Sequence, residues 1–173
     1  MTTDLRDLYQ QVILDHQRSP RNFRVIPQAD RITKGHNPLC GDQVTIYLKL
    51  EGGKVADVSF QGVGCAISVS SASMMTERIK GKSVDEVRLL FQSFHKLLTG
   101  YPRDVGPGRR LVSAGGSDHR SAAVPGLDLL GKLKVFAGVR EYPIRVKCAT
   151  LPWHALHAAI EGSEATVSTE LHE

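Results

Sequence analysis

Apolar and polar residues alternate strictly from Gln43 to Leu50, which is the pattern of a half-buried β-strand. The segment Glu51–Lys54 contains two adjacent glycines and predicts a hairpin loop. The apolar face consists of Val44, Ile46, Leu48 and Leu50, followed by Ala56, Val58 and Phe60 on the return strand. A further extended segment leads into this hairpin from its N-terminal side. The pattern therefore predicts a small antiparallel sheet of about three strands.

Apolar residues spaced three and four positions apart predict helices in most of the remaining chain. The first predicted helix follows Asp4, the second runs from about Ala66 to Lys80, and the third follows the capping box Ser83–Glu86. A fourth is predicted from Leu127 to Phe136, and a fifth starts near Thr150 and ends at Gly162. Tyr142–Cys148 is expected to be extended, because Pro143 disfavours helix in the residue before it. Strands early in the chain and helices after them indicate an α+β fold, with the helices packed on one face of the sheet.

A chain of 173 residues is long enough for one domain with its own core, and we expect that domain to span residues 1–162. Residues 101–126 break the periodicity, since 11 of these 26 residues are Gly, Pro or Ser. They are predicted to form a surface insertion. Residues 163–173 are expected to be a disordered tail.

Composition excludes several classes of function. The formal charge is +4, but the basic residues are scattered and aromatic residues make up only 6%, which argues against a nucleic-acid partner. No apolar run approaches the roughly 20 residues that span a bilayer, so no membrane association is expected. The first nine residues are too polar for a secretory signal, and three cysteines cannot all pair. We therefore expect a cytoplasmic protein with reduced thiols.

The segment Asn37–Asp42 places a thiol and a carboxylate two positions apart. Pro38 fixes its own φ and Gly41 permits a tight turn, so that Cys40 and Asp42 face one point. Sulfur and oxygen ligands together suit a borderline metal such as zinc. Cys65 and Cys148 would complete a tetrahedron, and each is expected to end an extended segment at the start of a helix. Two alternatives remain open: the thiols are small core residues, or His36 takes a place among the ligands.

Three cysteine motifs resemble those of the IscU/SufU iron–sulfur cluster assembly proteins, which are also called NifU N-terminal-like. The motifs are Asn37–Asp42, Gly62–Ser68 and Lys147–Trp153. The similarity also includes Tyr9–His16, Ser19–Asn22 and Ser71–Met75, and it covers nearly all of residues 5–161 except the insertion. It implies the IscU/SufU-like α+β fold.

The sequence is more similar to the SufU-type branch than to the IscU-type scaffolds. Scaffolds usually carry a histidine just before the third cysteine and a Leu-Pro-Pro-Val-Lys stretch for a chaperone. This chain has Lys147 before that cysteine and Pro143–Lys147 in place of the stretch. It also has extra sequence between the second and third cysteines, as SufU proteins do.

This resemblance implies a zinc-dependent sulfurtransferase that accepts persulfide sulfur from a SufS-type cysteine desulfurase. It delivers the sulfur to a downstream cluster-assembly complex. The implied zinc ligands are Cys40, Asp42, Cys65 and Cys148. Cys40 is the implied nucleophile, which leaves zinc to attack the persulfide, and Arg145 is implied to help dock the partner or reorganise the site. The main alternative is a scaffold that assembles a [2Fe–2S] cluster on the same ligands, and the second alternative is a purely structural zinc domain.

Overall fold

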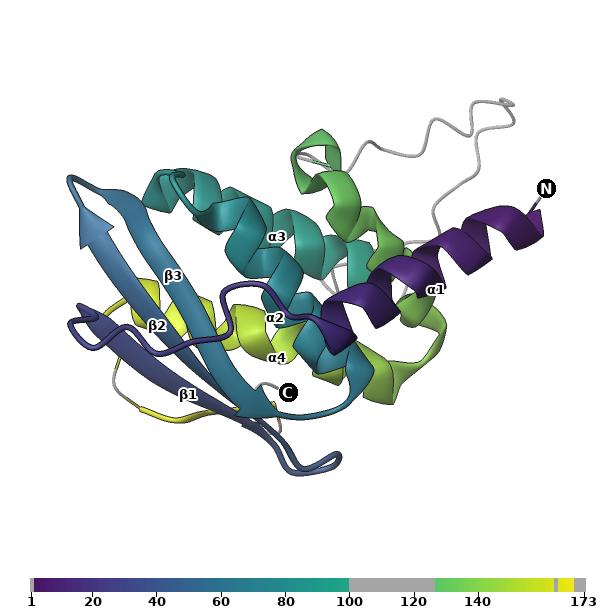
Figure 1. The fold of residues 1–173 in the computed structure, drawn as a ribbon, viewed down its shortest axis with the longest axis horizontal. Helices are drawn as coiled ribbons and strands as arrows, with labels where there is room; N and C mark the ends of the chain where they lie inside the picture. The colour runs from purple at the N-terminus through teal and green to yellow at the C-terminus, as the bar shows by residue number, and fades with distance from the viewer. Residues whose placement is uncertain (1, 100–126, 164, 170–173) are drawn as a thin grey trace, which may run out of the picture.

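A four-stranded sheet with helices packed on one face forms the framework of the protein (Figure 1). The computed structural model describes residues 2–99, 127–163 and 165–169. The predicted insertion at 101–126 lies outside the described residues. The description resumes with the helix that starts at Leu127. The expected α+β architecture is confirmed.

The predicted hairpin forms the centre of the sheet. Strands β2 (Asp42–Glu51) and β3 (Lys54–Val63) are antiparallel, and β1 (Arg31–Asn37) pairs antiparallel with the other edge of β2. A short strand, β4 (Val167–Ser168), pairs parallel with β1, so the sheet order is β3-β2-β1-β4. The sheet is therefore mixed rather than purely antiparallel. Its fourth strand lies in the segment for which a disordered tail was expected.

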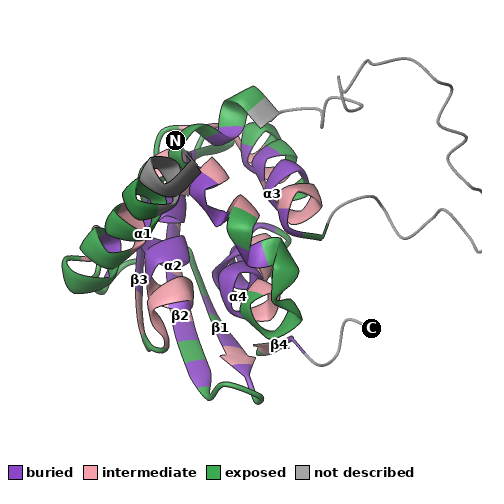
Figure 2. Cartoon of the chain, turned by 90° about the vertical axis from the view of Figure 1, so that its right-hand side faces the viewer, coloured by how far each residue is buried: buried purple, intermediate pink, exposed green. Residues whose placement is uncertain are grey.

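Alternation along β2 buries one set of side chains against the helices. Val44, Ile46 and Leu48 are all nearly inaccessible to solvent, as the strand pattern predicts. Helices α2 (Ala66–Ile79) and α4 (Pro143–Ile160) cover this face, with α2 lying against β3 and α4 against β1 and β2. Figure 2 shows the buried sides of α2, α4 and the strands facing each other.

The remaining helices form an outer layer around α2 and α4. They are α1 (Thr2–Arg18), α3 (Val84–Thr99) and the 3₁₀ helix η1 (Leu127–Glu141). The helix expected at Leu127–Phe136 is thus present in the tighter 3₁₀ form and is longer, with a break at Gly131. No helix in the described ranges combines the length and the apolar character that crossing a bilayer requires.

The expectation of an extended segment at Tyr142–Cys148 is wrong, because α4 begins at Pro143. Proline restricts the residue before it, and Tyr142 is indeed extended, but proline itself is favoured in the first turn of a helix. The helix that was expected to start near Thr150 therefore begins earlier, and Pro152 lies inside it. Cys148 is therefore a residue of the second turn of α4 and not the residue before a helix.

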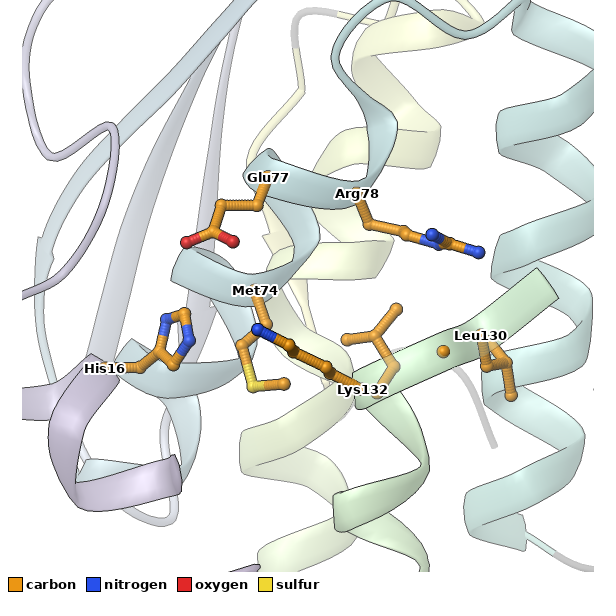
Figure 3. Close-up of a pocket in the computed structure, with 8 residues that line it drawn as sticks. His16, Met74, Glu77, Arg78, Leu130 and Lys132 are labelled. Carbon is orange, nitrogen blue, oxygen red and sulfur yellow. The ribbon is translucent and has the colours of Figure 1, made fainter. Parts of the chain in front are cut away.

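A cavity of about 280 Å³ lies between α1, α2 and η1 (Figure 3). His16, Glu77, Arg78 and Lys132 supply its polar lining, and Met74 and Leu130 are among its apolar residues. Met74 is nine residues beyond Cys65, which corresponds to roughly 13 Å along a helix. The cavity is therefore separate from the cysteine cluster.

Candidate metal centre

Cys40 is exposed in the turn that joins β1 to β2. The turn is closed by a hydrogen bond from the Gly41 N–H to the Asn37 carbonyl at 2.8 Å. Gly41 has a φ of 70°, a conformation that most side chains disfavour. The sequence Pro38–Gly41 thereby presents the Cys40 thiol at the end of the sheet, where β3 also leads into α2 (Figure 1).

Asp42 is the first residue of β2, and its side chain is buried. Its Oδ1 accepts a hydrogen bond from the Cys65 N–H at 2.9 Å, and its Oδ2 lies 3.7 Å from the Cys65 Sγ. An added Cβ at Gly64 would lie 2.9 Å from Asp42 Oδ1, so glycine is required for this approach. The carboxylate is thus held at the N-terminus of α2, where an anion is favoured.

Cys65 is the N-cap residue of α2, as its sequence context predicts. Its thiol is half-buried, and a hydrogen bond from the Cys148 thiol is the main cause that lowers the pKa of Cys65 to about 6. Cys65 thus adjoins both Asp42 and Cys148.

Cys148 is wholly buried in α4, and its Sγ lies 3.4 Å from the Cys40 Sγ. Its hydrogen bond to Cys65, followed by burial, raises the pKa of Cys148. The Asn37 Nδ2 also lies 3.7 Å from this sulfur. A metal ion would displace the remaining thiol protons, because metal ligands bind as thiolates.

Three of the four predicted ligand residues lie together, and the fourth, Cys65, is next to them. Ligand atoms of Cys40, Asp42 and Cys148 all lie within 4.8 Å of one another, and Cys65 contacts this group through Asp42 and Cys148. Zinc–sulfur bonds of about 2.3 Å and zinc–oxygen bonds of about 2.0 Å place tetrahedral ligands roughly 3.5–3.8 Å apart. The observed separations of 3.4 and 3.7 Å are close to that range. Cys40, Asp42 and Cys148 therefore have the spacing and the chemistry of zinc ligands, and Cys65 adjoins them as a candidate fourth ligand.

Two hydrogen bonds join the helices that carry the buried thiols. The Ser71 hydroxyl on α2 donates to the Ala149 carbonyl on α4 at 2.6 Å. The Trp153 Nε1–H on α4 donates back to the same hydroxyl oxygen at 3.2 Å. All three residues are fully buried, so this pair of bonds sets the position of Cys148 relative to α2.

Arg145 and His36 occupy different positions relative to this cluster. Arg145 is exposed in the first turn of α4, three residues before Cys148 and hence on the same side of the helix. His36 alternates along β1 with the buried Asn37, so its side chain points to the opposite face of the sheet. The structure therefore does not bring His36 to the cysteines.

Asn37 and Thr169 are contacts of the site that the sequence pattern did not identify as such. Asn37 is the first residue of the Asn37–Asp42 motif, but nothing in the sequence marks its amide as a contact of Cys148. Thr169 donates a hydrogen bond to the Asn37 side chain over a separation of 132 residues, and no local pattern marks it.

Comparisons with known proteins agree with the motifs. Residues 8–149 match the family described as the NifU-like N-terminal domain. The zinc-dependent sulfurtransferase SufU of Bacillus subtilis (strain 168) is 35% identical over 161 residues, which cover 93% of this chain and 95% of that protein. The scaffold protein IscU of Streptococcus pyogenes serotype M1 is 32% identical, with 92% and 86% covered.

A solved structure from Fervidobacterium islandicum AW-1 has a similar fold. That protein is described as a candidate iron–sulfur cluster assembly scaffold for the SUF system. It superposes with a TM-score of 0.70 at 32% identity and covers 86% of this chain and 93% of its own. The homologues of this chain are thus SufU and IscU proteins of iron–sulfur cluster assembly.

Proposed function

The chain belongs to the NifU-like N-terminal domain family, and on this premise we propose that it is a zinc-dependent sulfurtransferase of iron–sulfur cluster assembly. It accepts persulfide sulfur from a SufS-type cysteine desulfurase and delivers it to a downstream cluster-assembly complex. The similarity to the zinc-dependent SufU along nearly the whole length of both chains supports this choice.

One observation carries the proposal: an exposed thiol lies directly beside a buried cluster of metal-binding groups. Cys40 is on a surface turn, whereas Asp42 and Cys148 are buried and Cys65 is half-buried. A purely structural zinc site does not depend on an exposed ligand. A sulfur acceptor requires one, because thiol exchange at sulfur depends on access.

The four residues have different roles in this proposal. Cys40, Asp42, Cys65 and Cys148 would hold zinc, which when bound keeps thiols deprotonated at neutral pH. The Cys40 thiolate attacks the outer sulfur of the desulfurase persulfide. A new S–S bond forms at Cys40, the S–S bond of the donor breaks, and the donor cysteine leaves as a thiolate. The transferred sulfur keeps its proton, so atoms and charge balance.

A scaffold that assembles a [2Fe–2S] cluster on the same residues is the second candidate function. The similarity to the Streptococcus IscU over 92% of this chain favours it, and thiolates bind iron–sulfur clusters as readily as zinc. Lys147 stands where scaffolds usually have a histidine, which favours the sulfurtransferase.

Metal analysis and a sulfur-transfer assay distinguish the two functions. The protein is purified anaerobically, its zinc and iron are quantified, and it is incubated with a SufS-type desulfurase and cysteine. We expect one zinc per chain, a lower melting temperature after chelation, and a mass increase of one sulfur on Cys40. Stoichiometric iron with a visible charge-transfer spectrum and no zinc would overturn the sulfurtransferase in favour of the scaffold.

A further inference from the structure

The side chain of Asn37 connects the cysteine cluster to the C-terminal strand. Asn37 is the last residue of β1 and is fully buried. Its Oδ1 accepts hydrogen bonds from the Leu39 N–H and the Thr169 hydroxyl, each at 3.2 Å, and its Nδ2 lies 3.7 Å from the Cys148 Sγ. One amide group therefore contacts the Cys40 turn, α4 and the C-terminal segment.

The hydrogen-bond partners determine which way the amide is oriented. A main-chain N–H only donates, so the atom that faces Leu39 must be the carbonyl oxygen of the side chain. The NH₂ group is consequently directed at Cys148, and reversing the amide would place an NH₂ group against the Leu39 N–H, which cannot accept a hydrogen bond. The amide thus offers an N–H to a sulfur atom that is shielded from water.

Thr169 is held in turn by the sheet. Val167 and Ser168 pair with Gly35 and His36 of β1, and the Thr169 N–H donates to the His36 carbonyl at 3.3 Å. The Thr169 side chain is 7% exposed, so water competes little for its hydroxyl. Strand β4 therefore brings a buried hydroxyl donor to the amide oxygen of Asn37.

We propose that Asn37 is a positioning residue for Cys148, and that Thr169 keeps its amide directed at that sulfur. A buried thiolate needs a hydrogen-bond donor to replace water, and partners of metal ligands fix ligand orientation and affinity. Asn37 and Thr169 would thereby hold the Cys148 sulfur in place as a metal ligand. This inference rests on the proposed metal site but not on sulfur transfer.

A purely structural role is the alternative, because the bond from the Leu39 N–H to Asn37 Oδ1 also shapes the Cys40 turn. The variant Asn37→Asp separates the two roles. Aspartate retains an oxygen for Leu39 and Thr169, but it replaces the N–H donor with a second oxygen that faces Cys148. A structural role predicts little change, whereas a positioning role predicts weaker metal binding.

The test measures zinc affinity by competition with a chromophoric chelator, together with the visible spectrum of the cobalt(II)-substituted protein. We expect Asn37→Asp to weaken zinc binding by about 10–100-fold and to alter the cobalt spectrum. Thr169→Val should weaken binding in the same direction by a smaller factor, and Thr169→Ser should retain wild-type affinity. Thr166→Val is the matched control, since Thr166 is exposed in the same segment.

Two results would overturn the proposal. The first is wild-type zinc affinity and cobalt spectrum in both Asn37→Asp and Thr169→Val. The second is a loss of metal-free stability in these variants with an unchanged cobalt spectrum, which would assign Asn37 a structural role alone. A protein that binds zinc but accepts no sulfur would contradict the proposed function and leave this test valid.

Discussion

The Sγ atoms of Cys40 and Cys148 lie 3.4 Å apart, although Cys40 is exposed on a turn and Cys148 is wholly buried in α4. The two thiols therefore share one site but differ in access to a partner protein. The buried thiol is additionally held by Asn37 and by the hydrogen bonds that join α2 to α4.

We expect Cys40→Ala to abolish sulfur acceptance while most of the zinc remains bound through the other three ligands. Cys148→Ala should lose zinc more severely, because it removes the ligand that the fold holds most firmly. Persulfide on the protein is measured by mass spectrometry and zinc by elemental analysis. Normal sulfur transfer by Cys40→Ala would show that Cys40 is not the nucleophile.

Arg145→Ala should reduce the rate of sulfur transfer by roughly tenfold without reducing zinc content, because an exposed charge beside the site influences association more than folding. The reduction in transfer rate should become smaller as the salt concentration increases. Arg140→Ala is the control, since Arg140 is also exposed but lies in η1. Equal effects of the two substitutions on the transfer rate would exclude a specific role for Arg145.

Gly64→Ala should destabilise the protein by about 1–3 kcal/mol and weaken zinc binding. The added Cβ would overlap the Ser68 Oγ and crowd Asp42 Oδ1 at 2.9 Å. Gly138→Ala provides the control, since a Cβ there meets nothing within 4 Å.

The double variant Gly64→Ala/Ser68→Ala relieves the overlap with the hydroxyl but not the contact with Asp42. It should regain stability in chemical denaturation and still bind zinc weakly. If the double variant binds zinc like the wild type, the crowding of Asp42 has no effect on the metal.

Stability should fall on acidification below pH 6.5 in part because of His16. This histidine is 4% exposed with its Nδ1 2.7 Å from the Ser73 Oγ, and burial, with Arg21 second, lowers its pKa below the ordinary 6.5. Just below pH 6.5, His16 therefore binds a proton more readily in the unfolded chain than in the folded chain. The stabilisation is complete above pH 6.5 and is lost as pH falls through the folded-state pKa.

His16→Asn should show a smaller loss of unfolding free energy than the wild type between pH 7 and 5. Urea denaturation of both metal-free proteins at each pH measures this difference in unfolding free energy. Cys65 is present in both proteins, so its contribution cancels in the comparison. Parallel pH profiles would mean that His16 titrates alike in the folded and unfolded chains.

Local patterns were sufficient to predict the parts of the fold in which one face is buried along a regular element. The alternation in β2 and the glycines of Glu51–Lys54 predicted the hairpin, and the apolar spacing after Cys65 predicted α2. Arginine, valine and lysine before Cys148 do not distinguish strand from helix, so the start of α4 was misplaced. Strand β4 has two residues and shows no periodicity at all.

The cysteine cluster was accessible from sequence because thiols are few and their motifs are distinctive. Their supporting contacts were not, because they depend on tertiary pairing. Thr169 reaches Asn37 only after β4 joins β1, and Asn37 reaches Cys148 only after α4 packs on the sheet. Such contacts depend on how distant segments pair in the fold, and a short stretch of sequence carries no information about that pairing.

Trp153 provides an intrinsic optical reporter of the metal centre. It is the only tryptophan in the chain, it stacks on Phe94 with ring centroids 4.6 Å apart, and its indole N–H bonds to Ser71. The Ser71 hydroxyl also donates a hydrogen bond to the carbonyl of Ala149, the residue after Cys148. A shift of Cys148 should therefore change the polarity around the indole. Fluorescence of the unlabelled protein should therefore follow metal loading and partner engagement in real time, without an attached dye.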